Sequence, residues 1–486
     1  MTRREFLTLA VSGISAACVS GTFESALSQT TRIPMRDVII VIPGILGSTL
    51  YASNRAAWAP SLGAINDMLL GLWRHKERLQ LSNDPVDTDD LGDGVEARAL
   101  MPDLHLAPGL WKVDGYSQLR RDLLANFEIQ LGLNYFEFPY DWRRDNRVSA
   151  RRLEKCVDTW LNKWRLHSGN RTAKVIFVCH SMGGLIALYY LEVLGGWRKT
   201  KSLITFGTPF SGSMKALNFV ANGYEQDFPL VGTIELSAVS SLLRSFTSVY
   251  QLLPTYPCCY NNNTLVSIDR LSGIPNLDQR KLNNAITFHA EIAAAQAANI
   301  ALPEYTQSKY TLCNVIGINE PTLVTGSLDR SGFKTSTVTG VFGGDGTVPR
   351  LSAKSNDASL VYVTEFHGSL QNSERVFEQL EGFVTEERTR EALPLEEIHL
   401  FLADAYPAGK PIEARVSTEQ SPSKSRIYIG ISKSKDPSKR PVRTRELRPN
   451  RGMSFDVTFD ALPIGSYRVV AWTNTGQSVA DVIAVL

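Results

Sequence analysis

Three short apolar segments, each rich in β-branched residues, constrain this chain more than any other feature. They are residues 37–42, 174–178 and 201–206. A continuous apolar run of this length is typical of a strand that is buried on both faces of a parallel sheet. Residues 185–191 follow the second run after two glycines, and we expect them to form a buried helix. Strand, turn, helix and strand in this order predict an α/β fold.

Two long segments interrupt this pattern, at about residues 51–112 and 211–307. Long stretches inside a compact domain are usually lids or binding loops. After residue 396 the pattern changes to short alternating runs without a helical period, which predicts a small all-β sandwich. The runs are residues 398–402, 412–416, 426–431, 454–459, 467–472 and 479–485. We therefore expect a catalytic α/β domain over residues 29–390 and a β-sandwich domain over residues 391–486.

The first residues differ from the rest of the chain. Arg3 and Arg4 precede an apolar stretch over residues 7–19, which is too short to span a bilayer comfortably. Paired arginines are typical of a twin-arginine export signal, so residues 1–28 predict a bacterial protein that is exported to the periplasm or the medium. Lipoprotein processing at Cys18 is an alternative to cleavage after Ser28, and a buried N-terminal helix is a third interpretation.

The bulk composition excludes several classes of function. The 486 residues carry a formal net charge of only +2, whereas chains that bind nucleic acid are usually far more basic. The six cysteines are irregularly spaced and form no Cys-x-x-Cys pair, which argues against a metal site and against a disulfide framework. A single disulfide bridge remains open in an oxidising compartment.

Ser181 is the candidate nucleophile. It stands in Cys179-His180-Ser181-Met182-Gly183, between the second predicted strand and the predicted helix. The nucleophile elbow, Gly-x-Ser-x-Gly, is a strained turn that presents a serine hydroxyl above such a sheet. Cys179 replaces the first Gly of that pattern but is still small enough for the turn. The alternative interpretation is an ordinary turn whose serine caps the helix.

A serine nucleophile needs a histidine base, and here the base should follow the serine in the chain. Only His289, His367 and His399 do so. His399 lies in the predicted β domain, and His289 lies in the second long segment, where a lid histidine is plausible. His367 follows the strand-like residues 360–363 and precedes Gly368, so it occupies the end of a strand, where a catalytic histidine is expected.

The candidate acid is Asp345, which lies in the Gly- and Pro-rich loop 343–349. Such a loop can hold a carboxylate in a fixed position. Asp269 and Asp357 lack a comparable context, and a plain β-turn aspartate is the alternative interpretation. For the oxyanion hole we expect the backbone amide of Met182 and the amide of Ile45, in the turn after the first strand.

Together these segments resemble the lecithin:cholesterol acyltransferase family. The matching motifs are residues 43–48 (PGILGS), 140–143 (YDWR), 180–184 (HSMGG), 206–212 (FGTPFSG) and 344–349 (GDGTVP). His367 falls where the histidine of that family is expected. The resemblance implies an α/β-hydrolase fold and a serine-dependent lipid-ester hydrolase or O-acyltransferase that works through an acyl-enzyme. It also implies a lipid or membrane-surface substrate and no metal or organic cofactor.

Other interpretations remain open at this stage. The protein could be an esterase for soluble or polymeric esters, or a non-catalytic binding protein whose β domain contacts glycans or the cell surface. The apolar residues 68–73 could enter a lipid interface or could pack on the core. The basic stretch 433–451 could attract an anionic surface, although a solvated loop is the simpler interpretation.

Overall fold

The computed structural model describes most of the chain after residue 31. The described ranges are residues 32–59, 76–102, 105–107, 111–223, 236–340, 343–385, 398–403, 405–418, 426–433, 443–447, 454–473 and 478–485. The predicted export signal, Cys18, the apolar segment 68–73 and the predicted domain join near residue 390 lie outside these ranges. The domain boundary therefore remains a prediction.

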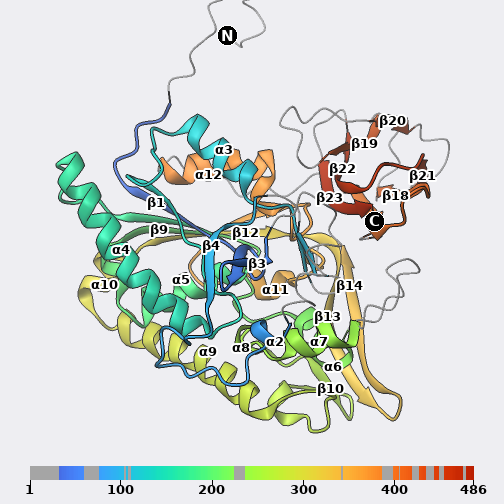
Figure 1. Cartoon of the computed structure of the whole chain (residues 1–486), viewed down its shortest axis with the longest axis horizontal. Helices are drawn as coiled ribbons and strands as arrows, with labels where there is room; N and C mark the ends of the chain where they lie inside the picture. Colours follow the sequence, from blue (N-terminus) through green and yellow to red (C-terminus); the bar gives the residue numbers. More distant parts are fainter. Residues whose placement is uncertain are drawn as a thin grey trace, which may run out of the picture.

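A six-stranded parallel sheet forms the centre of the molecule (Figure 1). Its strand order is β15-β12-β9-β8-β1-β7. The strands are β1 (Val38–Ile42), β7 (Tyr135–Glu137), β8 (Val175–His180), β9 (Thr200–Phe206), β12 (Thr311–Gly317) and β15 (Ser359–Val363). Every neighbouring pair is parallel. The predicted α/β class is confirmed, and the three apolar runs are the adjacent strands β1, β8 and β9.

Both faces of this sheet are covered, which explains why its strands read as continuous apolar runs. In β1, Val38, Ile40 and Ile42 pack on one side into a core with helices α4 (Asn146–Ser168) and α5 (Met182–Glu192). Ile39 and Val41 point to the other side, into a core with α3 (Ser117–Asn126) and α12 (Glu374–Val384). Figure 1 shows α3 and α12 on the opposite side of the sheet from α4 and α5.

The path of the chain through the sheet places the loops of interest together. The chain first moves from β1 to β7 on one side and then returns to β8 on the other side of β1. Ligands in open α/β sheets bind outside the carboxyl ends of the strands, near such a reversal. The turn after β1 and the turn after β8 therefore meet at the carboxyl edge of the sheet.

The described part of the first long segment forms small elements of its own. A three-stranded sheet contains β2 (Ser48–Ala52), β3 (Arg55–Trp58) and β4 (Val95–Leu100). The other elements are the short helix α2 (Lys76–Leu79) and the hairpin of β5 (His105–Ala107) and β6 (Trp111–Val113).

The described part of the second long segment is mainly helical. It contains α6 (Met214–Asn222), α7 (Leu236–Arg244), α8 (Thr247–Tyr250), α9 (Gln279–Ile300) and α10 (Pro303–Ser308), with the short strands β10 (Cys259–Asn261) and β11 (Thr264–Val266). The long hairpin of β13 (Asn319–Asp329) and β14 (Gly332–Gly340) was not predicted; it pairs with β10 and extends that small sheet.

Arginines after β7 attach both long segments to the sheet. Arg143 is fully buried and binds Asp93 and Asp141 at 2.8 and 2.6 Å. Arg144 binds Asp84 at 2.6 Å, and each of these two side chains is only 5% exposed. Arg147 reaches Glu291 of α9 at 2.7 Å. The Tyr140–Arg143 motif and the residues after it therefore anchor the surrounding loops.

The C-terminal residues form two antiparallel-rich sheets around one apolar core, as predicted. One sheet has the order β16-β18-β21, and the other has the order β17-β23-β22-β19-β20. The strands are β16 (Ile398–Leu402), β17 (Ala405–Tyr406), β18 (Ile412–Thr418), β19 (Ile427–Lys433), β20 (Arg443–Leu447), β21 (Ser454–Phe459), β22 (Gly465–Thr473) and β23 (Ser478–Val485). The strands β17 and β20 were not predicted. None of the helices in the described ranges is both long enough and apolar enough to cross a membrane.

The buried pair of Asp84 and Arg144 gives a first prediction. Replacing Asp84 by Ala leaves a buried guanidinium without its carboxylate, and breaking such a pair costs about 3 kcal/mol. We expect Asp84→Ala to lower the free energy of unfolding by that amount in chemical denaturation. Asp158→Ala is the control, because Asp158 and its partner Lys199 are 47% and 40% exposed and should contribute less than about 1 kcal/mol. Equal losses in the two variants would contradict this reading.

His289 on α9 gives a prediction about pH. Burial lowers the pKa of its imidazole, which hydrogen-bonds the carbonyl oxygen of Gln251 at 2.9 Å. The unfolded chain takes up a proton below its ordinary pKa of about 6.5, whereas the folded chain resists it, so this contribution to stability is lost as pH falls. We expect wild-type protein to lose more unfolding free energy between pH 7 and 5 than His289→Gln. The same loss in both proteins would exclude His289 as a source.

Candidate active site

The backbone at Ser181 is strained. The residue lies between β8 and α5 with φ 51° and ψ −125°, in a region that L-residues rarely adopt. The flanking elements impose this conformation: the amide of Ser181 donates to Phe206 of β9 at 2.8 Å, and the hydroxyl of Thr208 donates to the carbonyl of Ser181 at 2.9 Å. The sharp strand-to-helix turn expected of a nucleophile elbow is therefore present, with Cys179 in place of glycine.

The three residues predicted for catalysis are brought together. His367 Nε2 lies 2.9 Å from Ser181 Oγ, and His367 Nδ1 lies 2.7 Å from Asp345 Oδ2. All three residues are buried, with exposed fractions of 3% or less. Electrostatic interactions are stronger when water is excluded in this way. The arrangement is that of a serine whose base is oriented by a carboxylate.

The loop around Asp345 fixes the direction of its carboxylate. Oδ1 accepts hydrogen bonds from the amides of Thr347 and Val348 at 2.9 and 2.6 Å, which leaves Oδ2 for His367. The amide of His367 also donates to the backbone carbonyl of Asp345 at 2.8 Å. The acid and the base are thus joined through both their side chains and their backbones.

Gly207 shows how closely the segments meet here. A Cβ atom at this position would lie 2.7 Å from Asp345 Oδ2 and 2.9 Å from His367 Nδ1, and the residue has φ +56°. Any side chain would therefore push into the contact between acid and base. The FGTPFSG motif that contains Gly207 was recognised in the sequence, but its steric role was not.

The turn after β1 lies against the nucleophile and is held by aromatic side chains. A Cβ atom at Gly44 would lie 2.9 Å from Ser181 Cβ. Trp58 Nε1 donates to the carbonyl of Leu46 at 2.8 Å, and Trp142 Nε1 donates to that of Ser48 at 2.9 Å. The hydroxyl of Tyr140 donates to the carbonyl of Pro43 at 2.9 Å. The turn that contains Ile45 is therefore rigid before any substrate arrives.

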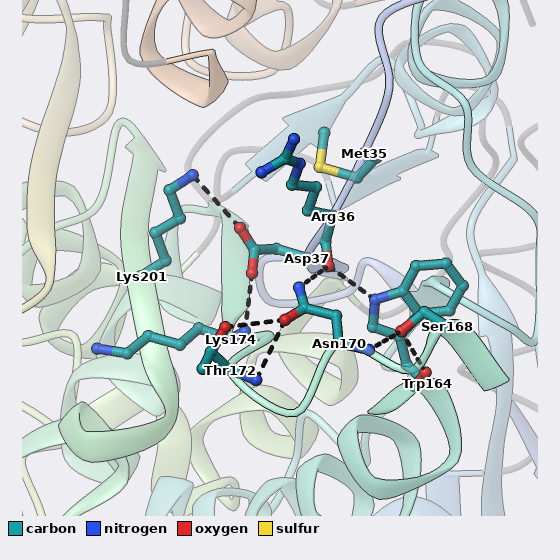
Figure 2. A pocket seen from close by; sticks show the side chains of 9 residues that line it. All are labelled: Met35, Arg36, Asp37, Trp164, Ser168, Asn170, Thr172, Lys174 and Lys201. Carbon is teal, nitrogen blue, oxygen red and sulfur yellow. Dashed lines mark hydrogen bonds and ion pairs between the residues drawn. The ribbon is translucent and has the colours of Figure 1, made fainter. Parts of the chain in front are cut away.

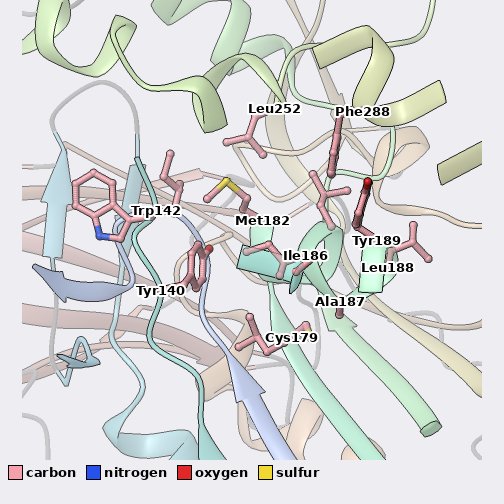
Figure 3. Close-up of a cluster of buried hydrophobic side chains, with 14 of the residues drawn as sticks. Tyr140, Trp142, Cys179, Met182, Ile186, Ala187, Leu188, Tyr189, Leu252 and Phe288 are labelled. Carbon is pink, nitrogen blue, oxygen red and sulfur yellow. The ribbon is translucent and has the colours of Figure 1, made fainter. Parts of the chain in front are cut away.

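Helix α5, which begins at Met182, packs against apolar side chains of the buried cluster shown in Figure 3. Figure 3 shows Met182 near Tyr140, Trp142 and Leu252, the last of which comes from the second long segment. Further along the helix, Tyr189 stacks on Phe288 of α9 with ring centroids 5.5 Å apart. This packing fixes the amino end of α5, which carries the backbone amide of Met182.

Tyr116 and His180 belong to the site, although the sequence did not point to them. The amide of Gly44 donates to Tyr116 Oη at 2.8 Å, and Tyr116 Oη lies 2.9 Å from His180 Nδ1. Burial raises the pKa of the Tyr116 hydroxyl, so it stays protonated and can donate to His180 Nδ1. His180 Nε2 then donates to the carbonyl of His367 at 3.0 Å.

This chain of hydrogen bonds joins the turn after β1 to the loop of the histidine. It also occupies the amide of Gly44, which leaves the next amide, that of Ile45, as the candidate oxyanion donor in that turn. His180 stands directly before the nucleophile in the recognised motif, which could have drawn attention to it. No comparable signal marks Tyr116.

The alternative residues lie elsewhere. His399 is on β16, in the C-terminal sheets, and His289 is bonded to Gln251 on the second long segment. Asp357 forms an ion pair with Lys309 at 3.5 Å, and Asp269 lies in a short 3-10 helix over Ile268–Arg270. Neither aspartate belongs to the loop that binds His367.

The described cysteines are all free, including the neighbours Cys258 and Cys259, whose sulfur atoms are 3.7 Å apart. Burial raises the pKa of the Cys179 thiol well above its usual range, so the residue beside the elbow remains a neutral small side chain.

Within the described residues, no group of three or more His, Cys, Asp or Glu side chains is arranged to hold a metal ion.

A surface hollow of about 580 Å³ lies at the other end of the sheet (Figure 2). Its lining residues include Asp37 and Lys174, which directly precede β1 and β8, and Lys201, which lies near the start of β9. Asp37 accepts from the amide of Lys174 at 2.8 Å and pairs with Lys201 at 3.3 Å. Because Ser181 follows the carboxyl end of β8, this hollow is not part of the candidate active site.

Comparison with known proteins supports the same family as the motifs. The family model for lecithin:cholesterol acyltransferase matches residues 112–352, close to half of the chain. The match contains Ser181 and Asp345 and ends before His367. Bovine (Bos taurus) lysosomal phospholipase A and acyltransferase is 24% identical over 249 residues, which are 45% of this chain and 58% of that protein. Chicken (Gallus gallus) phosphatidylcholine-sterol acyltransferase is 29% identical over 28% of this chain and 35% of its own length.

The chain thus spans little more than half the length of the curated relatives that it matches. Among solved structures, the Tle4–Tli4 complex contains a chain with a TM-score of 0.45 and 16% identity, covering 73% of this chain and 98% of that chain. Bacillus licheniformis lipase BlEst2 in its mature form has a TM-score of 0.30 and 14% identity, covering 72% and 91%. Structural similarities of this size do not bear on function. From the family match and the ordered motifs, we conclude that this chain is distantly homologous to the lecithin:cholesterol acyltransferase family.

Proposed function

We propose that this protein is a serine-dependent lipid-ester hydrolase or O-acyltransferase that works through an acyl-enzyme. One observation carries the proposal: Ser181, His367 and Asp345 form a continuous hydrogen-bonded chain at the carboxyl edge of the sheet. The names of the relatives, a phospholipase A and acyltransferase and a sterol acyltransferase, support lipid esters as the substrate class.

In the first half of the reaction, His367 Nε2 takes the proton of Ser181 Oγ while that oxygen attacks the ester carbonyl. The carbonyl oxygen becomes an oxyanion, which the amides of Met182 and Ile45 would stabilise, each by about 3 kcal/mol. The intermediate then collapses. The bond from the acyl carbon to the leaving alcohol breaks, and the alcohol oxygen takes the proton from His367.

In the second half, an acceptor hydroxyl gives its proton to His367 and attacks the acyl carbon of the acyl-enzyme. Collapse of this intermediate breaks the bond to Ser181 Oγ, which recovers a proton from His367. If the acceptor is water, the product is a free fatty acid. If it is an alcohol, the product is a new ester. Asp345 holds the imidazole in the orientation that both halves require.

Gly183 is part of the support for the oxyanion donors. A Cβ atom on this residue would lie 2.5 Å from the carbonyl oxygen of Pro43 and 2.7 Å from that of Ile42. These backbone atoms cannot move aside without moving the turn that carries Ile45. The distance between the two oxyanion donors therefore depends on the absence of a side chain at this position.

We also propose that the protein acts outside the cytoplasm of a bacterium, on the basis of Arg3, Arg4 and the apolar stretch that follows them. Detection of the mature protein in the periplasm or the medium, and its retention inside cells when both arginines are replaced by lysine, would test this.

The acyl-enzyme is tested with a labelled phospholipid in vesicles, incubated with and without a long-chain alcohol. Mass spectrometry should detect free fatty acid without the alcohol and, for an acyltransferase, the alkyl ester with it. A fluorophosphonate probe should label Ser181. Ser181→Ala should reduce kcat by about 10³-fold or more, because the members of such a triad act as a unit.

Ser331→Ala is the matched control, because Ser331 is exposed on the turn between β13 and β14. It should retain wild-type activity. Full activity of Ser181→Ala on every ester would refute the proposal. Activity on short soluble esters without activity on vesicles would instead favour an esterase.

Gly183→Ala should separate the oxyanion donors and lower kcat by about 10²-fold, which is the usual effect of losing one donor. Gly169→Ala is the control: Gly169 ends α4 with φ +70° and has no atom near the position of a Cβ. That variant should cost about 1 kcal/mol of stability and leave kcat unchanged. Steady-state kinetics and thermal unfolding of both variants check this. A kcat of Gly183→Ala within twofold of wild type would contradict it.

A further inference from the structure

The residues immediately before His367 contact the C-terminal sheets. Glu365 is 4% exposed, and its Oε2 accepts a hydrogen bond from the amide of Ala480, on β23, at 3.1 Å. Phe366 packs against the apolar core of the C-terminal sheets. Both residues that precede the histidine are therefore held by the C-terminal sheets.

The residue immediately after His367 is held through a second path. The amide of Asp114 donates to the carbonyl of Gly368 at 2.9 Å. The carboxylate of Asp114 pairs with Arg468 of β22 at 2.6 Å, and the side chains of Asp114 and Arg468 are 7% and 21% exposed. Arg468 thus acts on the far side of the histidine loop through Asp114.

Further hydrogen bonds join the segment 114–116 to the histidine loop. Gln371 Nε2 donates to the carbonyls of Gly115 and Gly368, each at 3.0 Å. Asn372 Nδ2 donates to the carbonyl of Asp114 at 3.2 Å. The same segment carries Tyr116, which binds the turn after β1. A displacement of Asp114 would therefore reach both the base and the oxyanion turn.

We propose that the C-terminal sheets position the catalytic histidine. They clamp the histidine loop, residues 364–369, so that His367 stays aligned between Ser181 and Asp345. Arg468 is a positioning residue, since it touches the site only through Asp114. This proposal rests on the proposed catalytic role of His367.

The geometry explains why such a clamp matters. His367 must keep Nε2 near Ser181 and Nδ1 near Asp345 at the same time, and its loop connects β15 to α12 without a regular element around the histidine. Misplacing a catalytic group by about 1 Å can cost on the order of 10²-fold in rate. A separate module for binding glycans or surfaces would not require buried polar contacts on both sides of the histidine.

The test compares point variants of the full chain. Arg468→Met removes the charge and the donors of Arg468 at a similar side-chain length. It should lower kcat on labelled phospholipid, and the rate of fluorophosphonate labelling of Ser181, by about 10- to 100-fold while KM changes less than twofold. Arg468→Lys keeps a charged donor and should restore part of kcat.

Arg415→Met is the matched control. Arg415 also lies in the C-terminal sheets, on β18, and pairs with Asp456 at 2.6 Å, but both side chains are more than half exposed. This variant should keep wild-type kcat. A loss of kcat in Arg415→Met equal to that in Arg468→Met would overturn the specific role of Arg468.

A double variant separates positioning from general destabilisation. Asp114→Asn breaks the same pair from the other partner, so it should lower kcat similarly, and the double variant should lose no more than either single one. All kinetics are measured at a temperature where thermal unfolding shows each variant to be folded. If the losses of kcat in the two single variants multiplied in the double variant, the proposal would be overturned. An unchanged kcat in folded Arg468→Met would also overturn it.

The two proposals fail in different ways. If wild-type protein is not labelled at Ser181, the proposed function fails, and the clamp with it. If wild type is labelled and Arg468→Met is labelled at the same rate, the clamp is wrong and the proposed function stands.

Discussion

The contact of 2.9 Å between Ser181 Oγ and His367 Nε2 is the constraint on which the rest of the site depends. The two residues are 186 positions apart in the chain and follow strands that are separated by two others in the sheet. Neither lies in an unrestrained segment. Ser181 is held in a strained conformation by β9 and Thr208, and His367 is held by the loop of Asp345. Glycines at the points of closest approach let these backbones meet without side chains between them.

Much of the fold and of the candidate site could be predicted, because their signals are local. Burial on both faces of the sheet makes β1, β8 and β9 continuous apolar runs, and the elbow requires small residues around Ser181. Asp345 and His367 could be chosen as the acid and the base because of their local context. Asp345 lies in a Gly-rich loop, and His367 lies after the end of a strand. Six strands of the C-terminal sheets were also visible, because inward and outward residues alternate along them.

The remaining features depend on contacts that no local pattern records. Tyr116 belongs to the site only because its hydroxyl lies between Gly44 and His180, which come from two other segments. The pairing of Asp114 with Arg468 joins residues that are 354 positions apart. The sequence around each of them does not distinguish it from an ordinary surface Asp or Arg. The hairpin β13–β14 carries polar and small residues, including glycine, so its strands lacked the apolar runs that identified the sheet.

The contacts of β22 and β23 with the histidine loop also order events during synthesis. A nascent chain that has reached residue 400 already contains Ser181, Asp345 and His367, but it still lacks Arg468 and Ala480. Under the clamp proposed above, such a chain would carry the chemical groups of an esterase without their alignment. Full activity would then arise only after translation has supplied β22 and β23, so an unfinished polypeptide near a membrane would act only weakly on the lipids around it.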